Sequence, residues 1–238
     1  AVFIQNPIIN ELDEMRPSLL PNLLIGAKNN IARGYGNLAL FEAAPEFFGR
    51  NPGEQRAMAS GIRVGKTAKK DWTNSMRAYD VFDVKADALA VIAAAKGPIE
   101  APQITTDAPS YYHPGRSGVI RLGKNVLAYF GELHPAILKA LDIKTNVMAF
   151  EVFLDNIPLP RDAKSKAKKK LELSPLQAVD KDLAFVVARN VSAVSIAAAA
   201  KNADRSNIAD VRIFDVYEGE NLPEDKKSVA ISVTFQPK

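Results

Sequence analysis

The sequence predicts an α+β fold that is built on antiparallel sheets and divided into two domains. Several short stretches alternate apolar and polar residues, as strands with one buried face do, whereas others repeat apolar residues with helical spacing. The predicted strands and helices follow one another in mixed order, which favours an antiparallel sheet. A basic, proline-flanked stretch at residues 161–170 interrupts this pattern and predicts a linker.

The predicted elements of the first domain follow in order along the chain. Residues 18–31 carry an apolar helical stripe that stops at the glycines Gly34 and Gly36. A polar loop at residues 65–77 contains Trp72, and residues 79–84 lead into an alanine-rich helix at 86–96. A further short helix is expected at 135–141. Strands are expected at residues 1–7, 38–43, 56–64, 119–122, 126–131 and 146–153, with residues 123–125 forming the turn of a hairpin.

Composition restricts the class of protein. The chain has 238 residues, of which 47% are hydrophobic and 24% charged, as is ordinary for a soluble globular protein. The absence of cysteine excludes disulfides and any cysteine-based metal or nucleophile site. No stretch approaches the roughly 18 apolar residues of a membrane helix, and no signal peptide opens the chain, so a cytoplasmic protein is expected. Because the chain begins at Ala1 rather than Met, we expect a fragment of a longer polypeptide.

The net charge of +4 is concentrated in one place. Residues 161–170 carry six basic residues and one acidic residue, so the remainder of the chain is close to neutral. A solvated tether is one interpretation of this stretch, and a basic strip that contacts phosphates is the other.

The last part of the chain ends in a predicted hairpin at residues 214–235. Alternation predicts one buried face for its two strands, and Gly219 lies in the loop between them. Tyr217 ends the first strand, while Lys226, Lys227 and Ser228 open the second. An aromatic ring beside cations and a hydroxyl suits an unpaired nucleic-acid base, although a packing role for Tyr217 is the alternative. The residues expected on the buried face are Phe214, Val216, Val229, Ile231, Val233 and Phe235.

This hairpin and the stretches before it resemble a known family. SPLQAVDKDLAFVV at 174–187, the predicted helix at 192–202 and RSNIADVRIFDVY at 205–217 are similar to the ferredoxin-fold anticodon-binding domain of bacterial phenylalanyl-tRNA synthetase beta subunits. Upstream, NPIINELDEMRPSLLPNLL, LALFEAAPEFF, HPGRSG, GELHP and MAFEVFLDNI resemble, in family order, the catalytic-like module of the same subunit.

The resemblance implies the C-terminal part of such a beta subunit, in three segments. Residues 1–158 would be an inactive module similar to class II synthetases, which have an antiparallel sheet flanked by helices. Residues 159–171 would be the basic linker. Residues 172–238 would be the anticodon-binding domain, incomplete at its C-terminus because family members continue with another helix and strand.

The resemblance also implies site residues. Tyr217 and Ser228 fall on positions that contact anticodon bases in such domains, with Lys226 and Lys227 near the phosphates and Asp182 in the opening strand. The positions aligned with the ATP site are degenerate, which implies a catalytically inert module. Phe48 stands where motif 2 has its phosphate-binding arginine, Glu151 and Phe153 replace the glycines of motif 3, and Asn156 replaces its arginine.

The holoenzyme implied by the resemblance attaches phenylalanine to its tRNA with ATP and magnesium and contains two alpha and two beta subunits. This fragment itself would bind no cofactor. We expect it to bind the alpha subunit, and the apolar surface of Leu19, Leu20, Leu23 and Leu24 is expected to exceed what one helix needs. The alternative is a free-standing synthetase-derived RNA-binding or scaffold protein, which a pull-down with alpha would distinguish. The residues that replace the ATP site disfavour an autonomous ligase.

Other side chains are weaker candidates. His113 and His134 are the only histidines and have no third ligand at a suitable spacing, so no metal site is expected. HPGRSG lacks the spacing of a phosphate loop and is interpreted as a structural turn or subunit contact. Glu11, Asp13 and Glu14 are interpreted as a solvated helix start rather than an acid pair.

Overall fold

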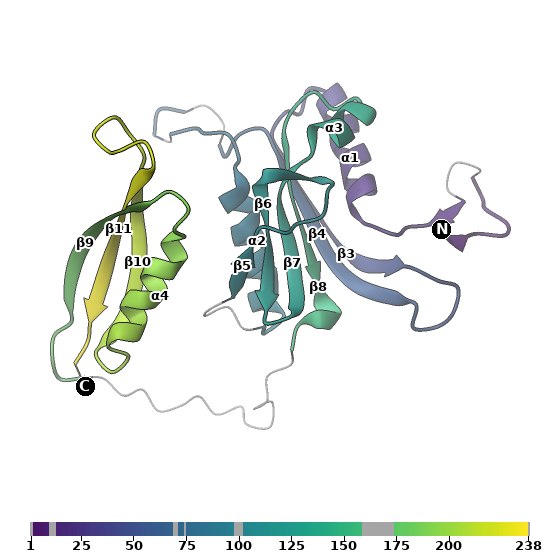
Figure 1. The fold of residues 1–238 in the computed structure, drawn as a ribbon. Coiled ribbons are helices and arrows are strands. Elements are labelled where there is room, and N and C mark those ends of the chain that lie inside the picture. Colours follow the sequence, from purple (N-terminus) through teal and green to yellow (C-terminus); the bar gives the residue numbers. More distant parts are fainter. Residues whose placement is uncertain are drawn as a thin grey trace. The chain divides into compact units, whose positions relative to one another are not determined.

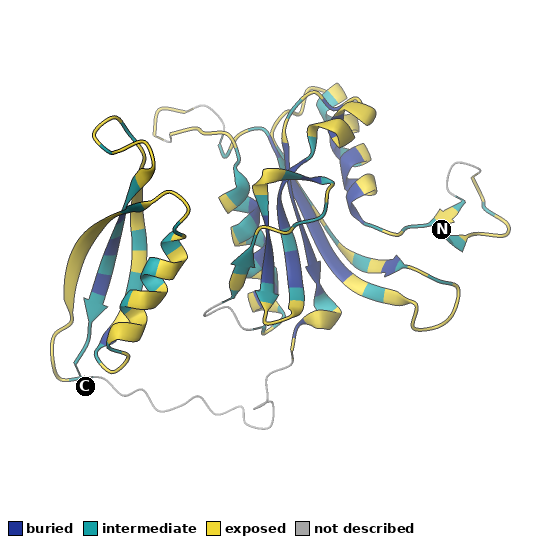
Figure 2. Cartoon of the chain, viewed as in Figure 1, coloured by how far each residue is buried: buried dark blue, intermediate teal, exposed yellow. Residues whose placement is uncertain are grey.

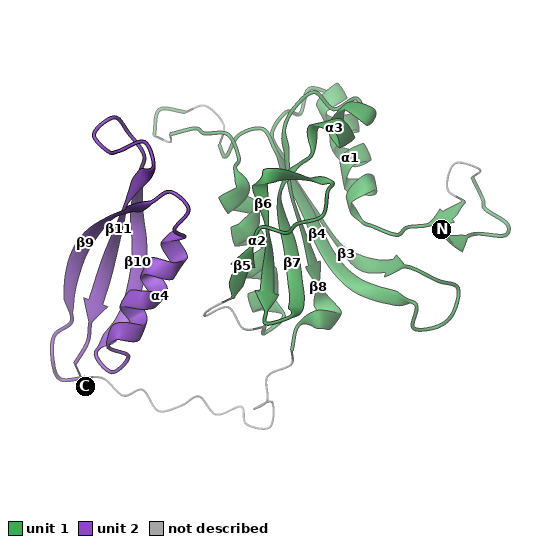
Figure 3. Cartoon of the chain, in the orientation of Figure 1, with its two compact units in different colours: residues 1–165 green, residues 166–238 purple. Residues whose placement is uncertain are grey.

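The chain folds into two compact units, residues 1–165 and 166–238 (Figure 3). The computed structural model describes residues 2–9, 13–68, 71–73, 75–97, 102–158 and 174–237. The predicted linker and its basic run lie outside these ranges. Both units combine helices with antiparallel sheets, which confirms the predicted α+β class. None of the helices described is long and apolar enough to cross a membrane.

The first unit is organised around a six-stranded sheet in which every neighbouring pair is antiparallel (Figure 1). The strand order is β3-β4-β8-β7-β6-β5. All seven residues of the central strand β8 are buried, because both of its faces are covered. A separate pair, β1 (Val2–Phe3) and β2 (Glu14–Met15), precedes the sheet. The six strands are β3 (Leu38–Phe47), β4 (Gln55–Val64), β5 (Gln103–Thr105), β6 (Tyr112–Leu122), β7 (Asn125–Leu133) and β8 (Val147–Phe153).

Helices cover both faces of this sheet. Helices α1 (Leu20–Ala32) and α3 (Pro135–Ala140) share one core with the β4 residues Ile62 and Val64, whereas α2 (Val81–Ala94) packs on the opposite face. Figure 2 shows the buried residues running along the central strands and the inward sides of the helices. A short 3-10 helix, η1 (Leu154–Asn156), follows β8.

Helix α1 agrees with its predicted span, but its leucines do not form the exposed apolar surface that was expected. Leu19, Leu20, Leu23 and Leu24 are each at most 7% exposed. They fill the core between α1 and the sheet, or a neighbouring cluster around Met58. The expectation that these four leucines supply surplus apolar surface is therefore wrong.

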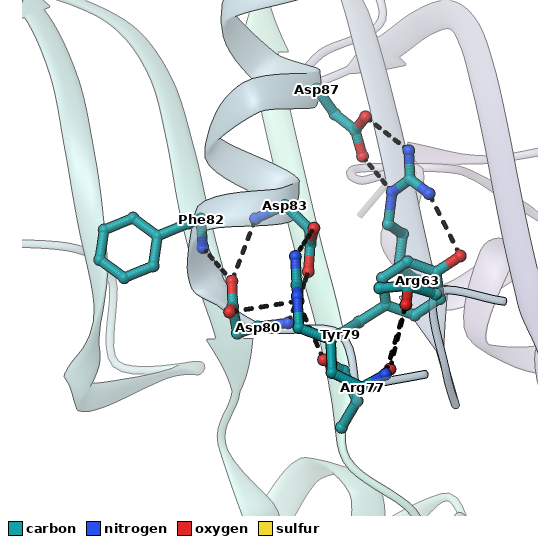
Figure 4. Close-up of polar contacts among 9 residues, drawn as sticks. Arg63, Arg77, Tyr79, Asp80, Phe82, Asp83 and Asp87 are labelled. Carbon is teal, nitrogen blue, oxygen red and sulfur yellow. Dashed lines mark hydrogen bonds and ion pairs between the residues drawn. The ribbon is translucent and has the colours of Figure 1, made fainter. Parts of the chain in front are cut away.

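Helix α2 begins at Val81, five residues before the predicted start at residue 86. The reason is a capping box: the Asp80 carboxylate accepts hydrogen bonds from the backbone N–H groups of Phe82 and Asp83, and the Asp83 carboxylate accepts one from the Asp80 N–H. Arg77 donates two hydrogen bonds of 2.7 Å to Asp83, which fixes the preceding loop to the helix start (Figure 4). This pairing lowers the pKa of Asp83.

The β6–β7 hairpin is longer than predicted. It turns through Gly123 and Lys124, and the φ of Gly123 is +61°, which glycine adopts readily. The segment HPGRSG lies within β6 rather than in a turn, at a break in register between Tyr112 and Ser117. Strand β5 was not predicted. It is only three residues long, too short to give a clear alternation.

The second unit contains β9 (Val179–Ala188), α4 (Ala193–Ala203), β10 (Ile208–Tyr217) and β11 (Lys226–Phe235). The sheet order is β10-β11-β9, so β9 and β10 run parallel to each other and flank the antiparallel β11. This is the split βαβ arrangement of ferredoxin-like folds. The predicted hairpin and the predicted helix are both confirmed.

The buried face of the hairpin differs partly from its prediction. Val229, Ile231 and Val233 are buried against α4, but Phe214 and Val216 are 52% and 47% exposed. A bulge explains Phe214: the pairing shifts between Ile213 and Asp215, so Phe214 has no partner on β11. Val216 pairs with the buried Val229 but lies next to the end of β10, where it stays exposed. The β10 residues that reach the core are Ile208, Val211 and Ile213.

Candidate nucleic-acid interface and a buried polar site

The face of the β10-β11-β9 sheet that points away from α4 is called the open face here. Tyr217 pairs with Ser228, and Ser228 pairs with Val186, so these three side chains form one row on it. Tyr217 is the last residue of β10 and is 43% exposed. The ring therefore lies at the edge of the sheet, where a planar group can reach it.

Small side chains form the floor beside Tyr217. The next row consists of Asp215, Ala230 and Ala184. Two alanines leave the sheet shallow there, so a flat base could approach the strands. The exposed Asp215 carboxylate lies on the same face as Tyr217 and can accept hydrogen bonds from the N–H groups of a base edge. Sequence reasoning missed Asp215, although two-residue alternation back from Tyr217 would have found it.

Gly219 leaves the space that the Tyr217 ring occupies. A Cβ atom at Gly219 would lie 2.1 Å from the hydroxyl oxygen of Tyr217 and 2.2 Å from the adjacent ring carbon. Only a residue without a side chain leaves room for the tyrosine in this orientation. The loop glycine, which the sequence suggested only as a turn residue, is therefore also a packing partner of the candidate stacking ring.

The two lysines that open β11 lie on different faces. Lys226 has the same parity as Ser228 and belongs to the open face, whereas Lys227 has the parity of the buried Val229 and lies on the α4 side. A third cation, Arg189, follows the β9 residue that pairs with Lys226. Its backbone N–H donates to the Asp225 carbonyl at 2.9 Å, and its guanidinium forms an ion pair of 3.7 Å with Glu218. No local pattern in the sequence predicts this proximity.

Asp182 lies on the open face but away from Tyr217. It pairs with Ser232, four residues along β11 from Ser228, which corresponds to roughly 13 Å at about 3.3 Å per residue. Asp180 and Asp210 lie one row further along, with Arg212 in the row of Asp182. The open face thus has an acidic end near Asp182 and an end near Tyr217 that offers a ring, a hydroxyl, a carboxylate and cations. Only the Tyr217 end combines groups that could hold an unpaired base and its phosphate.

In the first unit, three of the four degenerate positions lie together on the α1 face of the sheet. The guanidinium carbon of Arg56 lies 4.5 Å from the ring centre of Phe48 and 4.7 Å from that of Phe153. Arg56 also donates two hydrogen bonds, of 2.8 and 3.0 Å, to the fully buried carboxylate of Glu46. A cation that the sequence did not suggest is therefore present beside Phe48, but a carboxylate neutralises it and two rings enclose it.

Glu151 lies on the same face, two residues before Phe153 on β8. It is 3% exposed and accepts hydrogen bonds from the hydroxyls of Tyr111 at 2.9 Å, Tyr112 at 3.1 Å and Ser18 at 3.3 Å. Burial raises the pKa of Glu151, and burial together with the Glu151 charge raises the pKa of Tyr111. A buried carboxylate disfavours an anionic group beside it.

Asn156 is separated from this group and has a structural role. Its side-chain amide donates to the Val126 carbonyl at 2.8 Å, while the Asn125 amide donates to the Asn156 carbonyl at 2.7 Å. These bonds join η1 to the β6–β7 hairpin. The histidines also have local partners: His134 caps α3 by accepting from the Ala136 N–H, and His113 accepts from the Gly115 N–H. Among the described residues, no three potential ligands are grouped to hold a metal ion.

Comparison with known proteins agrees with both units. A family model described as "Phenylalanyl tRNA synthetase beta chain CLM domain" matches residues 1–154, and one described as "Ferredoxin-fold anticodon binding domain" matches residues 174–238. The phenylalanine–tRNA ligase beta subunit of Rhodospirillum rubrum is 51% identical to this chain over 237 residues, and that of Ruegeria pomeroyi is 49% identical over 238 residues. Each match covers 100% of this chain and 30% of the relative.

The fold, the open face and the two family matches together identify the chain as a member of the aminoacyl-tRNA synthetase class that carries a domain of the anticodon-binding type. The first family model covers well over half of the chain. The chain belongs to the family of phenylalanyl-tRNA synthetase beta chains. It spans about 30% of the length of the curated relatives that it matches.

Proposed function

We propose that this chain is a non-catalytic part of a phenylalanine–tRNA ligase, in which it binds the tRNA anticodon and the alpha subunit during ATP-dependent attachment of phenylalanine to its tRNA. Aminoacylation would take place on alpha, in an assembly of two alpha and two beta subunits in the cytoplasm. ATP and magnesium would be bound by the holoenzyme and not by this chain. The family membership and the arrangement of the open face support this role.

The observation that carries the anticodon role is the grouping around Tyr217. One anticodon base would stack on the Tyr217 ring, with its edge toward Ser228 and Asp215. The phosphates would lie at the end of the sheet, near Lys226 and Arg189. Stacking and edge contacts of this kind are how proteins read unpaired RNA bases. Lys227 would contribute less because it lies on the α4 face, and Asp182 would contribute less because its row lies about 13 Å along the strand from that of Tyr217.

The inert character of the first unit rests on Arg56 and Glu151. The cation nearest Phe48 is already paired with Glu46, so it is not free to stabilise charge on a phosphate. Glu151 places a carboxylate where a nucleotide would need a neutral, open backbone.

Pyrophosphate exchange tests the division of labour. The purified chain should show no phenylalanine-dependent exchange, whereas the assembly with alpha should show it. Exchange by this chain alone that disappears on substitution of Arg56 would contradict an inert module. Capture of alpha by the tagged chain tests the partnership, and a chain that ignores alpha while it still binds tRNA would favour a free-standing RNA-binding protein.

A further inference from the structure

A pocket of about 500 Å³ opens on the α1 face of the six-stranded sheet, and the proposed function does not use it. Cavities of this size suit small molecules, which typically occupy about 300–1,000 Å³. Most of its walls are apolar and come from α1, α3 and β7, through residues such as Leu24, Leu133 and Ile137. The polar groups of the wall are Ser18, Tyr111 and Glu151, together with Arg56, whose guanidinium is paired with Glu46.

Two carboxylates on this face of the sheet are matched by cations, whereas Glu151 is not. Glu42 pairs with Arg16 at 2.5 Å, and Glu46 pairs with Arg56 at 2.8 Å. Glu151 is held by hydroxyl groups alone, and within the described part of the chain no arginine or lysine pairs with it. The nearby charge of Glu46 also disfavours ionisation of Glu151. An ionised Glu151 would therefore leave an uncompensated negative charge beside the pocket.

Ser60, in the same row as Glu151, has no hydrogen-bond partner among the described residues, although it does not line the pocket. Ser60 pairs across the sheet with Glu42 on one side and Glu151 on the other, so its side chain lies on the same face. It is fully buried. Buried hydroxyls in native proteins nearly always have partners, and an orphaned one calls for an explanation.

We propose that this pocket binds a small primary ammonium compound with an apolar body. An ammonium group carries one positive charge and three N–H donors, so it can neutralise Glu151 and also donate to a neighbouring hydroxyl. The apolar body would lie against the leucine-rich walls. An anion of the same size would meet the Glu151 carboxylate, so the pocket selects against it.

Calorimetric titration of the full chain with three compounds of one shape tests this proposal. The compounds are 3-methylbutylammonium, 3-methylbutan-1-ol and 4-methylpentanoate. The amine should bind about tenfold tighter than the alcohol or better, which corresponds to one charge-assisted contact, and the carboxylate should not bind. Free leucine as a fourth compound distinguishes simple amines from amino acids, because only the latter bring a carboxylate into the pocket.

Variants locate the binding site. Glu151→Gln should weaken binding of the amine about tenfold or more and leave the alcohol unchanged. Glu132→Gln, which alters another buried carboxylate of the same sheet outside the pocket, should bind the amine as wild type does. Equal binding of amine and alcohol, no binding of either at millimolar concentration, or undiminished amine binding by Glu151→Gln would each overturn the proposal. The wild-type comparison decides the matter if the variant does not fold.

Discussion

The substitution Tyr217→Ala gives the most direct test of the open face. One exposed ring can stack on one base, and such a stack contributes about 1–3 kcal/mol per base. The variant should therefore bind an anticodon stem-loop about 5- to 150-fold more weakly. Tyr217→Phe keeps the ring and should retain most of the affinity. The measurement is fluorescence anisotropy of labelled stem-loop RNA over a range of salt concentrations.

The salt dependence separates stacking from charge. Loss of a ring releases no counterions, so the slope of log K against log salt should be the same in Tyr217→Ala and wild type. The variant should also lose discrimination against a stem-loop with an altered anticodon base. If Tyr217→Ala binds normally and still discriminates, Tyr217 is only a packing residue, and the placement of the base at this end of the sheet is wrong.

Gly219→Ala tests the same ring from the other side. The added methyl group would lie 2.1 Å from the Tyr217 hydroxyl oxygen, so the ring must move. We expect a loss of RNA affinity that is smaller than that of Tyr217→Ala, because the displaced ring can still contact a base. In the double variant, the glycine substitution should add no further loss, since the group through which it acts is gone. Additive losses would show that Gly219 acts independently of the ring.

Three further outcomes follow from the structure. Lys226→Ala should weaken RNA binding and lower the salt slope by about 0.7, the value for one phosphate contact on a single strand, whereas Lys227→Ala, on the opposite face, should change neither. Arg56→Ala leaves the buried Glu46 carboxylate unpaired and should reduce the free energy of unfolding by about 3 kcal/mol, measured by denaturant titration. Because burial raises the pKa of Glu151, the folded state binds its proton more tightly than the unfolded state. The free energy of unfolding should then fall as pH rises from the ordinary glutamate pKa through the raised one, and an unchanged pH slope in Glu151→Gln would refute this assignment.

Local patterns made most of the fold predictable. Alternation located the strands around residues 38–64 and the final hairpin, and helical spacing located α1 and α4. The start of α2 was missed, although Val81 and Val84 already belong to the apolar stripe that Ala88 and Ile92 continue. The signal there was the pair Asp80 and Asp83, a capping box made with aspartate in place of the usual Glu or Gln.

The candidate sites were less predictable, because they depend on cross-strand register. Arg56 reaches Phe48 only because Glu46 and Arg56 are opposite each other on β3 and β4, a pairing that no local pattern reveals. The placement of Lys227, in contrast, was available from the sequence. It precedes Val229 by two residues, so alternation assigns it to the buried face and Lys226 to the open one.

The polar groups on the α1 face connect the inert module with the proposed ligand. Buried ion pairs and carboxylates stabilise a fold less than apolar side chains of the same shape, because desolvation of the charges opposes their attraction. Glu46, Arg56, Ser60 and Glu151 nevertheless lie in the layer between the sheet and its helices, beside a pocket that apolar residues could have filled. Departures from an apolar core of this kind concentrate at functional sites. A buried carboxylate that would oppose a nucleotide is, by the same charge, suited to a cation, so Glu151 links the proposed lack of ATP chemistry to the proposed ammonium site.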